Sequence, residues 1–160
     1  MVPHLDSALR LARWLARDPV LAEDVVQEAA LRAFKHIASY DGGDGRAWFL
    51  KVVRNAAYDA LAARKRSDGY LGSDDGLDAF EDPADGPEAI LSRSQDRDVL
   101  AKALAALPLD LRECLVLREL EGFSYKEIAQ TVGVPTGTVM SRLWRARQTL
   151  MENAAKGMET

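Results

Sequence analysis

The sequence predicts an all-α fold of two small helical domains joined by a flexible acidic linker. Apolar residues recur every three or four positions in both ends of the chain, which is the spacing of one helix face, and no stretch shows the alternation typical of strands. The segment between the two ends is rich in acid, glycine and proline and cannot bury enough apolar surface to fold. We therefore expect domains at residues 1–66 and 93–160 and a linker at 67–92.

Composition narrows the class of protein. Hydrophobic residues form 48% of the 160 residues, which is enough for a core, and no apolar run approaches the roughly 18–20 residues of a membrane span. The first residues lack a basic patch followed by an apolar stretch, so we expect no signal peptide, and the single cysteine, Cys114, excludes an internal disulfide. With only His4 and His36 as further soft ligands, we expect a cytoplasmic protein that does not insert in a membrane and holds no metal or other cofactor.

The acidic net charge of −4 comes from the linker. Residues 67–92 hold eight acids and no base, whereas residues 1–66 hold 11 Lys and Arg against 8 Asp and Glu, and residues 93–160 hold 10 against 9. Both predicted domains are therefore mildly basic. The low net charge of the whole chain does not argue against binding to nucleic acid.

The first two predicted helices include a candidate docking face. The first helix follows the apolar spacing from Leu5 to Leu15 and ends at Asp18–Pro19, and the second runs from about residue 21 to 38. The expected core stripe of the second helix comprises Val26, Ala29, Ala30, Ala33, Phe34 and Ile37. Its opposite face comprises Asp24, Gln27, Glu28, Leu31, Arg32 and Lys35. An apolar residue ringed by charges, here Leu31, is typical of a docking surface, although a solvated face gives a similar pattern.

A loop of turn-forming residues at 40–45 leads into a third helix at about 46–66. Its inward positions are Phe49, Val52, Val53, Ala56, Ala60 and Leu61. Another face carries Lys51, Arg54, Asn55 and Tyr58. Basic and amide groups beside an aromatic ring suit phosphate contacts and stacking on unpaired bases. The alternative is a basic solvated helix with Trp48 in the core.

The second domain contains a predicted helix-turn-helix. Two amphipathic helices come first, one with Val99, Leu100, Ala103, Leu104 and Leu107 on its apolar face and one from 109 to 121, with Leu111, Cys114 and Leu115 inward. Pro108 ends the first and Gly122 the second. Ser124 and Glu127 then have the spacing of a capping box, which starts a short helix that turns at Gly133 and restarts at Thr136.

The helix after this turn has the character of a DNA-reading helix. Its expected core positions are Val139, Leu143, Ala146 and Leu150, and its outward positions are Thr138, Ser141, Arg142, Arg145 and Gln148, with Arg147 beside them. No acid occurs from residue 136 to 151, so the helix is positive where a duplex would lie. An ordinary helical hairpin with a basic surface is the alternative.

Both domains together resemble the extracytoplasmic-function (ECF) group of bacterial RNA polymerase sigma factors. In the first domain the resemblance rests on residues 22–28 (AEDVVQE), 46–48 (RAW) and Arg54-Asn55. In the second it rests on Leu107-Pro108, residues 122–129 (GFSYKEIA), 137–139 (GTV) and the SRL and RAR triplets at 141–143 and 145–147. The resemblance implies sigma region two followed by region four.

The resemblance also implies a role for each surface. Docking on the β′ clamp coiled coil of core polymerase falls on Asp24, Gln27, Glu28, Leu31 and Lys35. Contacts to the opened minus-ten element fall on Tyr40, Asp41, Arg46, Trp48, Lys51, Arg54, Asn55 and Tyr58. Contacts to the minus-thirty-five element fall on Ser124, Thr136, Thr138, Ser141, Arg142, Arg145 and Arg147. Region four is expected to touch the β flap, the linker to occupy the RNA exit channel, and an anti-sigma factor to control the protein in a stress or envelope response.

One departure from the family pattern is an apolar strip of Met140, Trp144 and Met151 on the reading helix. We expect this strip to pack against region two or an anti-sigma partner. Other functions compete with the sigma-factor interpretation: a conventional two-domain helix-turn-helix regulator that acts without core polymerase, and an adaptor that captures a regulator. An enzyme is the weakest rival, because no nucleophile–base pair, metal-ligand spacing or phosphate loop is present.

Overall fold

The computed structural model describes residues 4–40, 42–67 and 94–158. Over these ranges the chain forms seven α-helices and one short 3₁₀ helix, η2 (Ile37–Ser39), with no strand, which confirms the all-α prediction. Asp41 and the predicted linker, apart from Ser67, lie outside the described residues.

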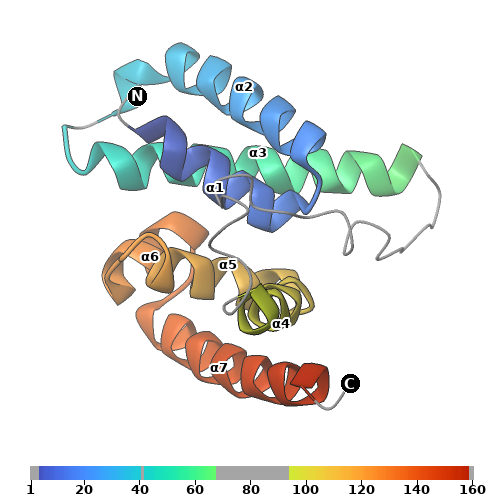
Figure 1. Ribbon diagram of the computed structural model, residues 1–160. Helices are drawn as coiled ribbons and strands as arrows, with labels where there is room; N and C mark the ends of the chain where they lie inside the picture. Colours follow the sequence, from blue (N-terminus) through green and yellow to red (C-terminus); the bar gives the residue numbers. More distant parts are fainter. Residues whose placement is uncertain (1–3, 41, 68–93, 159–160) are drawn as a thin grey trace.

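The first three helices form one bundle: α1 (Leu5–Ala16), α2 (Pro19–Lys35) and α3 (Gly45–Ser67) (Figure 1). Asp18 starts α2, since its carboxylate accepts hydrogen bonds from the backbone amides of Val20 and Leu21 at 3.0 and 3.3 Å. The same carboxylate binds Arg64 at 2.7 Å and so joins the beginning of α2 to the end of α3.

The other four helices form the second bundle: α4 (Ser94–Ala105), α5 (Leu109–Glu119), α6 (Tyr125–Val132) and α7 (Thr136–Met158). Gly122 and Gly133 adopt φ of +70° and +76° in the turns after α5 and α6, a conformation that favours glycine. The predicted capping box is confirmed, because Ser124 N donates to Glu127 at 2.8 Å and Glu127 N donates to the Ser124 hydroxyl at 3.1 Å. The helix-turn-helix therefore has the predicted form.

The core differs from the prediction at the end of α2. Its buried positions are Ala22, Val25, Ala29 and Ala33, whereas Phe34 and Ile37 are 75% and 52% exposed. The packed face of α2 consists mainly of small residues, which leaves Phe34 outside it, and Ile37 lies beyond the end of α2 at Lys35. Assigning these two residues to the core was wrong, and so was assigning Leu100 on α4, which is 52% exposed.

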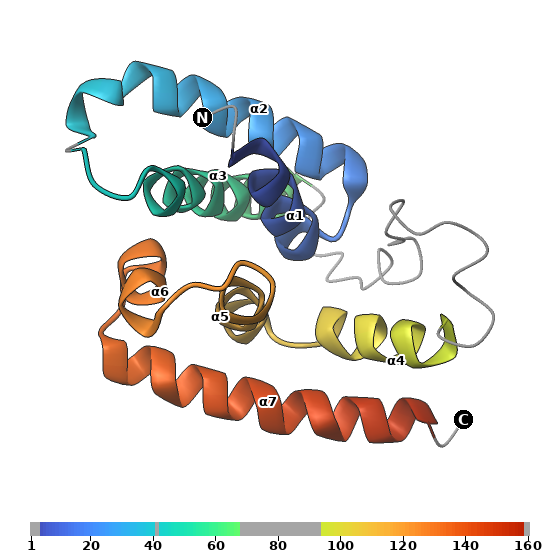
Figure 2. The same ribbon diagram turned by 60° about the vertical axis from the view of Figure 1, so that its left-hand side comes forward.

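The two bundles are stacked, with α5 and α6 of the second bundle facing α1 and α3 of the first (Figures 1 and 2). Helix α7 lies on the far side of the second bundle, away from the first (Figure 2). The buried apolar residues of both bundles form one continuous cluster. No helix among the described residues is both long and apolar enough to cross a membrane.

Candidate nucleic-acid interface

The predicted docking face on α2 is open to solvent. Asp24, Gln27 and Lys35 are exposed, and Leu31 is 60% exposed among them. Glu28 is exposed as well and forms an ion pair with Arg32 at 2.9 Å. The exposed side chains of Phe34 and Ile37 add apolar surface near the end of α2, in contrast to their predicted place in the core.

Four of the predicted minus-ten residues gather at one end of the first bundle. A surface cleft of about 290 Å³ is lined by Trp48, Lys51 and Asn55 on α3. The ring of Tyr40 packs against that of Trp48 with centroids 5.3 Å apart. An aromatic wall, an ammonium group and a side-chain amide around one cleft suit a nucleobase with its phosphate.

Four residues that were not predicted to contact DNA complete the cleft, namely Arg32, His36, Ser39 and Val52. Arg32 had been assigned to the docking face and Val52 to the core. Arg32, His36 and Ser39 come from α2 and the residues that follow it, whereas Val52 lies on α3. His36 and Ser39 have no helical spacing in common with the residues on α3. The sequence indicated their place in only one way: the short loop at 40–45 must hold the start of α3 close to the end of α2.

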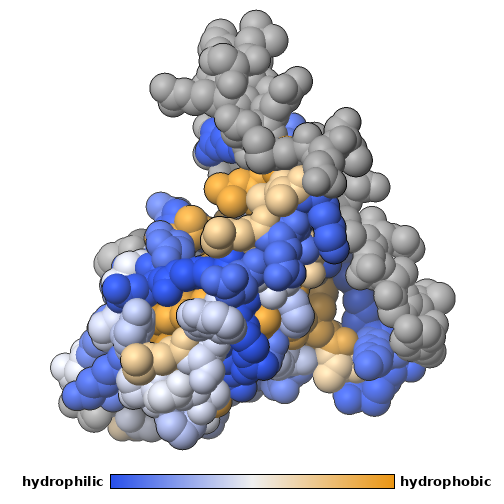
Figure 3. Space-filling view, turned by 90° about the horizontal axis from the view of Figure 1, so that it is seen from below, coloured by the Kyte–Doolittle hydropathy of each residue, from blue (hydrophilic) through white to orange (hydrophobic). Residues whose placement is uncertain are grey.

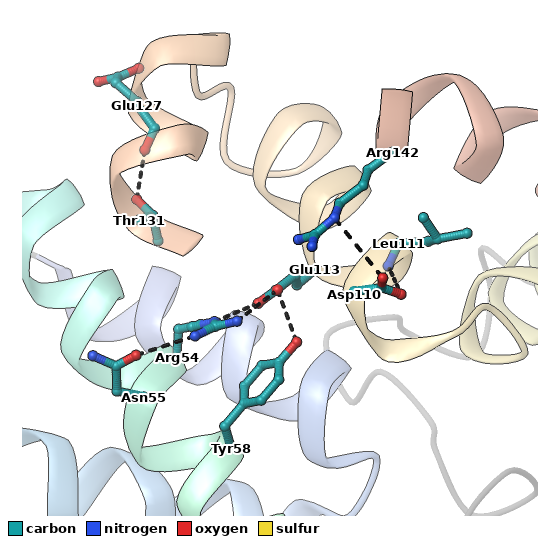
Figure 4. A network of polar contacts seen from close by, with 9 residues as sticks. All are labelled: Arg54, Asn55, Tyr58, Asp110, Leu111, Glu113, Glu127, Thr131 and Arg142. Atoms are coloured by element: carbon teal, nitrogen blue, oxygen red, sulfur yellow. Dashed lines mark hydrogen bonds and ion pairs between the residues drawn. The ribbon is translucent and has the colours of Figure 1, made fainter. Parts of the chain in front are cut away.

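Arg54 and Tyr58 point elsewhere, toward the second bundle (Figure 4). The Arg54 guanidinium donates to both carboxylate oxygens of Glu113 on α5, from Nε at 3.0 Å and from Nη2 at 3.2 Å. The Tyr58 hydroxyl donates to the same carboxylate at 2.9 Å, and the guanidinium lies 3.9 Å from the centre of the Tyr58 ring. Glu113 is completely buried by this arrangement.

The electrostatics of this cluster fix its protonation. Burial opposes the charge of Arg54, but the hydrogen bond and negative charge of Glu113 outweigh it and raise the pKa of Arg54. Burial, and then the charge of Glu113, raise the pKa of the Tyr58 hydroxyl well above its ordinary value. Arg54 is therefore a permanent cation and Tyr58 a neutral hydrogen-bond donor at neutral pH.

Arg46 also faces the second bundle, where its guanidinium lies 4.7 Å from the centre of the buried Phe123 ring. Beside it the Asp44 carboxylate caps α3 by accepting from the amides of Arg46 and Ala47 at 3.0 and 3.3 Å. A hydrogen bond with Glu127 of α6 lowers the pKa of Asp44 below its ordinary value. The structure thus divides the predicted minus-ten residues between an open cleft and the interface of the two bundles.

Further polar contacts across this interface come from α5 and the turn after it. Arg112 is 5% exposed and donates to the carbonyls of Trp14 and Leu15, at 2.7 and 3.1 Å, at the end of α1. The buried Glu121 binds Arg10 of α1 at 2.7 Å. Neither Arg112 nor Glu121 was predicted as an interface residue. The available signal was that α5 is apolar on more than one face, which indicates a helix buried on all sides.

On α7 the predicted core residues Val139, Leu143 and Ala146 are buried and Leu150 is partly buried. The predicted outward residues of α7 differ in solvent exposure. Ser141 and Arg145 are exposed, and Thr136 and the half-buried Thr138 lie in the first turn of the helix. Ser124 belongs to the cap of α6 rather than to this face.

Two arginines of the reading helix are held by acids of their own bundle. The Arg142 side chain is only 20% exposed and lies 4.0 Å from Asp110 (Figure 4), and Arg147 binds Glu119 at 3.1 Å. Among the described residues, no ion pair engages Arg145. Arg145 is therefore the most available of the three arginines on this helix.

The apolar strip of α7 does not pack against the first bundle. Met140, Trp144 and Met151 are 53%, 64% and 65% exposed, so this part of the sequence-based expectation was wrong. The face seen from below in Figure 3 is mainly hydrophilic, with apolar patches between the polar side chains.

Comparisons with known families and relatives agree with this geometry. The family Sigma-70 region 2 matches residues 2–67, and the family Sigma-70, region 4 matches residues 97–150. The chain is 37% identical to the ECF RNA polymerase sigma factor SigE of Mycolicibacterium smegmatis, over 96% of this chain and 59% of that protein. It is 35% identical to the ECF RNA polymerase sigma-E factor of Escherichia coli K12, over 79% of this chain and 70% of that protein. The chain thus spans only part of the length of both relatives.

Two solved structures have the same fold. One is the sigma factor RpoE in complex with the anti-sigma factor NepR from Bartonella quintana, with a TM-score of 0.75 and 31% identity over 95% of this chain and 92% of that one. The other is CnrH in complex with the cytosolic domain of CnrY, with a TM-score of 0.64 and 23% identity over 94% and 82% of the two chains. Both sigma regions in the family's order, together with these relatives, show that the chain belongs to the ECF group of RNA polymerase sigma factors.

Proposed function

We propose that this protein is a promoter-specificity subunit that binds core RNA polymerase, recognises two promoter elements and promotes DNA melting, without catalysing a reaction itself. We assign region two to residues 1–66, the linker to 67–92 and region four to 93–160. The observation that carries the proposal is that one chain combines an aromatic and basic cleft, suited to unpaired bases, with a helix-turn-helix, suited to duplex DNA.

Core polymerase would be held first by α2. Asp24, Gln27, Glu28, Leu31 and Lys35 form an exposed surface with an apolar centre, which fits docking on the β′ clamp coiled coil. Region four would contact the β flap. The two domains on one chain add affinity through effective concentration, so neither needs to bind tightly alone.

Recognition of the minus-ten element would use the cleft on region two. Trp48 and Tyr40 offer an aromatic surface, and Lys51 and Asn55 offer a cation and an amide beside it. Extruding a base costs a few kcal/mol, and stacking with hydrogen bonds in such a cleft offsets that cost. Arg46, Arg54 and Tyr58 would join this surface when region four is not packed on them; Asp41 lies outside the described residues.

Recognition of the minus-thirty-five element would use α7. Its first turns would enter the major groove with Thr136, Thr138 and Ser141 near base edges. Arg145, and after local rearrangement Arg142 and Arg147, would contact phosphates. Ser124, the N-cap residue of α6, would help to position the duplex on the protein and would not contact base edges.

Control by an anti-sigma factor is part of the proposal. A sigma factor with 31% identity and a TM-score of 0.75 was solved in complex with the anti-sigma factor NepR. The exposed residues Met140, Trp144 and Met151 offer apolar surface to such a protein. We place this protein in the cytoplasm, in a stress or envelope response.

The test is transcription in vitro. Sigma-free core polymerase is supplied with the full chain and genomic fragments of the source organism, and transcript starts are mapped. We expect discrete new starts preceded by a shared pair of elements. A chain that binds duplex fragments without polymerase, and gives no starts with it, would instead be a conventional helix-turn-helix regulator and would refute the proposal.

A further inference from the structure

We propose that Glu113 is an internal competitor for promoter DNA, whose carboxylate occupies an anion site formed by Arg54 and Tyr58 that takes a DNA phosphate once the two domains separate. This inference rests on the proposed function and deepens it. It assigns region four a second role besides reading duplex DNA, namely closing part of the strand-binding surface of region two in the free protein.

The donor geometry is that of an anion site. Arg54 presents two N–H groups to the two Glu113 oxygens at 3.0 and 3.2 Å, and Tyr58 adds a hydroxyl at 2.9 Å to one of them. A guanidinium fork with a hydroxyl beside it binds carboxylate and phosphate by the same charge-assisted hydrogen bonds. The occupant in this structure is a carboxylate from the same chain (Figure 4).

The closed arrangement excludes DNA from this site. Glu113 is completely buried, and Arg54 retains 21% of its side-chain exposure, so a strand cannot reach the donors while α5 covers them. Arg46 is covered in the same way by Phe123. The cleft around Trp48 and Asn55 lies outside the covered area and stays open. Of the seven described residues proposed for the minus-ten surface, three are therefore covered in the free protein and four stay available.

The interface combines a continuous apolar cluster with several polar contacts, and the polar contacts are the part that water can replace when the domains separate. The ion pair of Arg10 with Glu121 and the hydrogen bonds of Arg112 to two main-chain carbonyls can be replaced by water when the domains part. Loss of Glu113 from Arg54 exposes a cation that a phosphate then satisfies. Closed and open states can therefore exchange when a ligand binds the open one better.

The surfaces needed for earlier steps remain open in the closed state. The docking face of α2 around Leu31 is exposed, and α7 lies on the side of region four away from region two (Figure 2). We infer an order in which docking on polymerase precedes exposure of Arg54 and Tyr58. Premature capture of single strands by the free protein is thereby reduced.

The experiment measures binding of a labelled single-stranded oligonucleotide that carries the minus-ten sequence mapped by transcription in vitro. Full-length wild-type chain and Glu113→Gln are titrated without polymerase. We expect about tenfold tighter binding by Glu113→Gln, because a larger fraction of that variant is open. The matched control is Glu119→Gln on the same helix, which breaks an ion pair with Arg147 inside region four and should leave the affinity unchanged.

Two further variants keep the test decisive. Arg54→Gln placed in the Glu113→Gln background should abolish the gain, since the gain depends on that guanidinium. Glu121→Gln breaks a second ion pair between the described parts of the two domains without touching the anion site, and decides the question if Glu113→Gln loses helical content. Circular dichroism checks the helical content, and small-angle X-ray scattering should show a larger radius of gyration for both opening variants.

Equal affinity of wild type and of folded Glu113→Gln for the oligonucleotide would overturn the inference, and so would a gain that survives Arg54→Gln. If such variants still direct normal starts with core polymerase, only the inference fails. If the wild-type chain directs no starts at all, the proposed function fails.

Discussion

The two candidate DNA surfaces of this sigma factor differ in where their arginines find acids. In region two, the acid that holds Arg54 is Glu113, which belongs to the other domain. In region four, Arg142 and Arg147 lie beside Asp110 and Glu119 of their own domain. An acid in the same domain fixes the position of an arginine, whereas an acid in the other domain decides whether that arginine is available. The strand-binding surface is therefore partly closed and the duplex-reading surface open.

We expect the largest effect on stability from a substitution of Arg112, which joins the two domains. Arg112→Met removes four hydrogen bonds, to the carbonyls of Trp14, Leu15, Ala105 and Leu107, and leaves these groups without their donor. We expect the free energy of unfolding to fall by about 3 kcal/mol. Urea denaturation followed by circular dichroism measures it.

The control for this loss is Arg145→Met, on the exposed face of α7. It should change the free energy of unfolding by less than about 0.5 kcal/mol. A similar loss in both variants would mean that Arg112 does not join the two domains in the way its hydrogen bonds indicate.

Asn55 lines the open cleft of region two, and its substitution tests whether that cleft binds the extruded base. Asn55→Ala should lower the yield of open promoter complexes by about tenfold, or ~1.4 kcal/mol, because the proposed contact of its side-chain amide with the extruded base would be lost. Permanganate reactivity of thymines in the melted region measures the yield. Affinity for core polymerase should not change, because Asn55 lies on α3 and not on the docking face of α2. Parallel loss of polymerase binding would indicate a folding defect instead.

Asp18 pairs with Arg64 of its own domain. It tests whether such an acid stabilises the fold without blocking a DNA-binding surface. Asp18→Asn should lower the free energy of unfolding by about 1 kcal/mol at neutral pH, mostly through the cap of α2, since the ion pair with Arg64 is largely solvated. It should leave the affinity for the single-stranded oligonucleotide unchanged.

The hydrogen bond from Arg64 lowers the pKa of Asp18 in the folded chain. A lowered carboxyl pKa stabilises the fold above the ordinary value of about 4, and the effect is lost as the pH falls through the folded-state pKa. The difference between wild type and Asp18→Asn in urea denaturation should therefore shrink at pH 3. A constant difference would contradict the assignment.

The smallest expected effect separates two arginines of α7. Arg145→Ala should reduce the salt dependence of duplex binding by about 0.9 in the slope of log K against log salt, the loss of one phosphate contact. Arg142→Ala should reduce it less, because that side chain is 20% exposed and lies near Asp110. Electrophoretic mobility shifts with polymerase holoenzyme over a salt series measure both slopes. A larger change for Arg142→Ala would show that it leaves Asp110 on binding DNA.

Local signals predicted most of the fold. The spacing of apolar residues located the helices, and the capping box with Gly133 located the helix-turn-helix, because these features depend on neighbours within a few positions. The error at Phe34 and Ile37 arose because periodicity does not reveal which side of an alanine-rich helix is packed. Small residues let α2 approach its neighbours closely and leave its large side chains outside.

The site was less predictable, for a different reason. Helical spacing placed Arg54, Asn55 and Tyr58 on one helix face, and the family resemblance assigned that face to the minus-ten element. The structure separates Asn55, in the cleft, from the other two at the interface. Their partner Glu113 lies 59 residues from Arg54 along the chain. No local pattern relates positions so far apart, and on α5 Glu113 resembles an ordinary surface acid until the second bundle is placed on the first.

The distance between the domains tests the account most directly. Spin labels on Ala62→Cys and Glu152→Cys, two exposed positions in different domains, report this distance by pulsed electron resonance. The native Cys114 does not interfere, because burial raises the pKa of its thiol to about 11. We predict one short, narrow distance in the free chain and a longer one after addition of core polymerase. A distance that stays the same when polymerase binds would contradict the account.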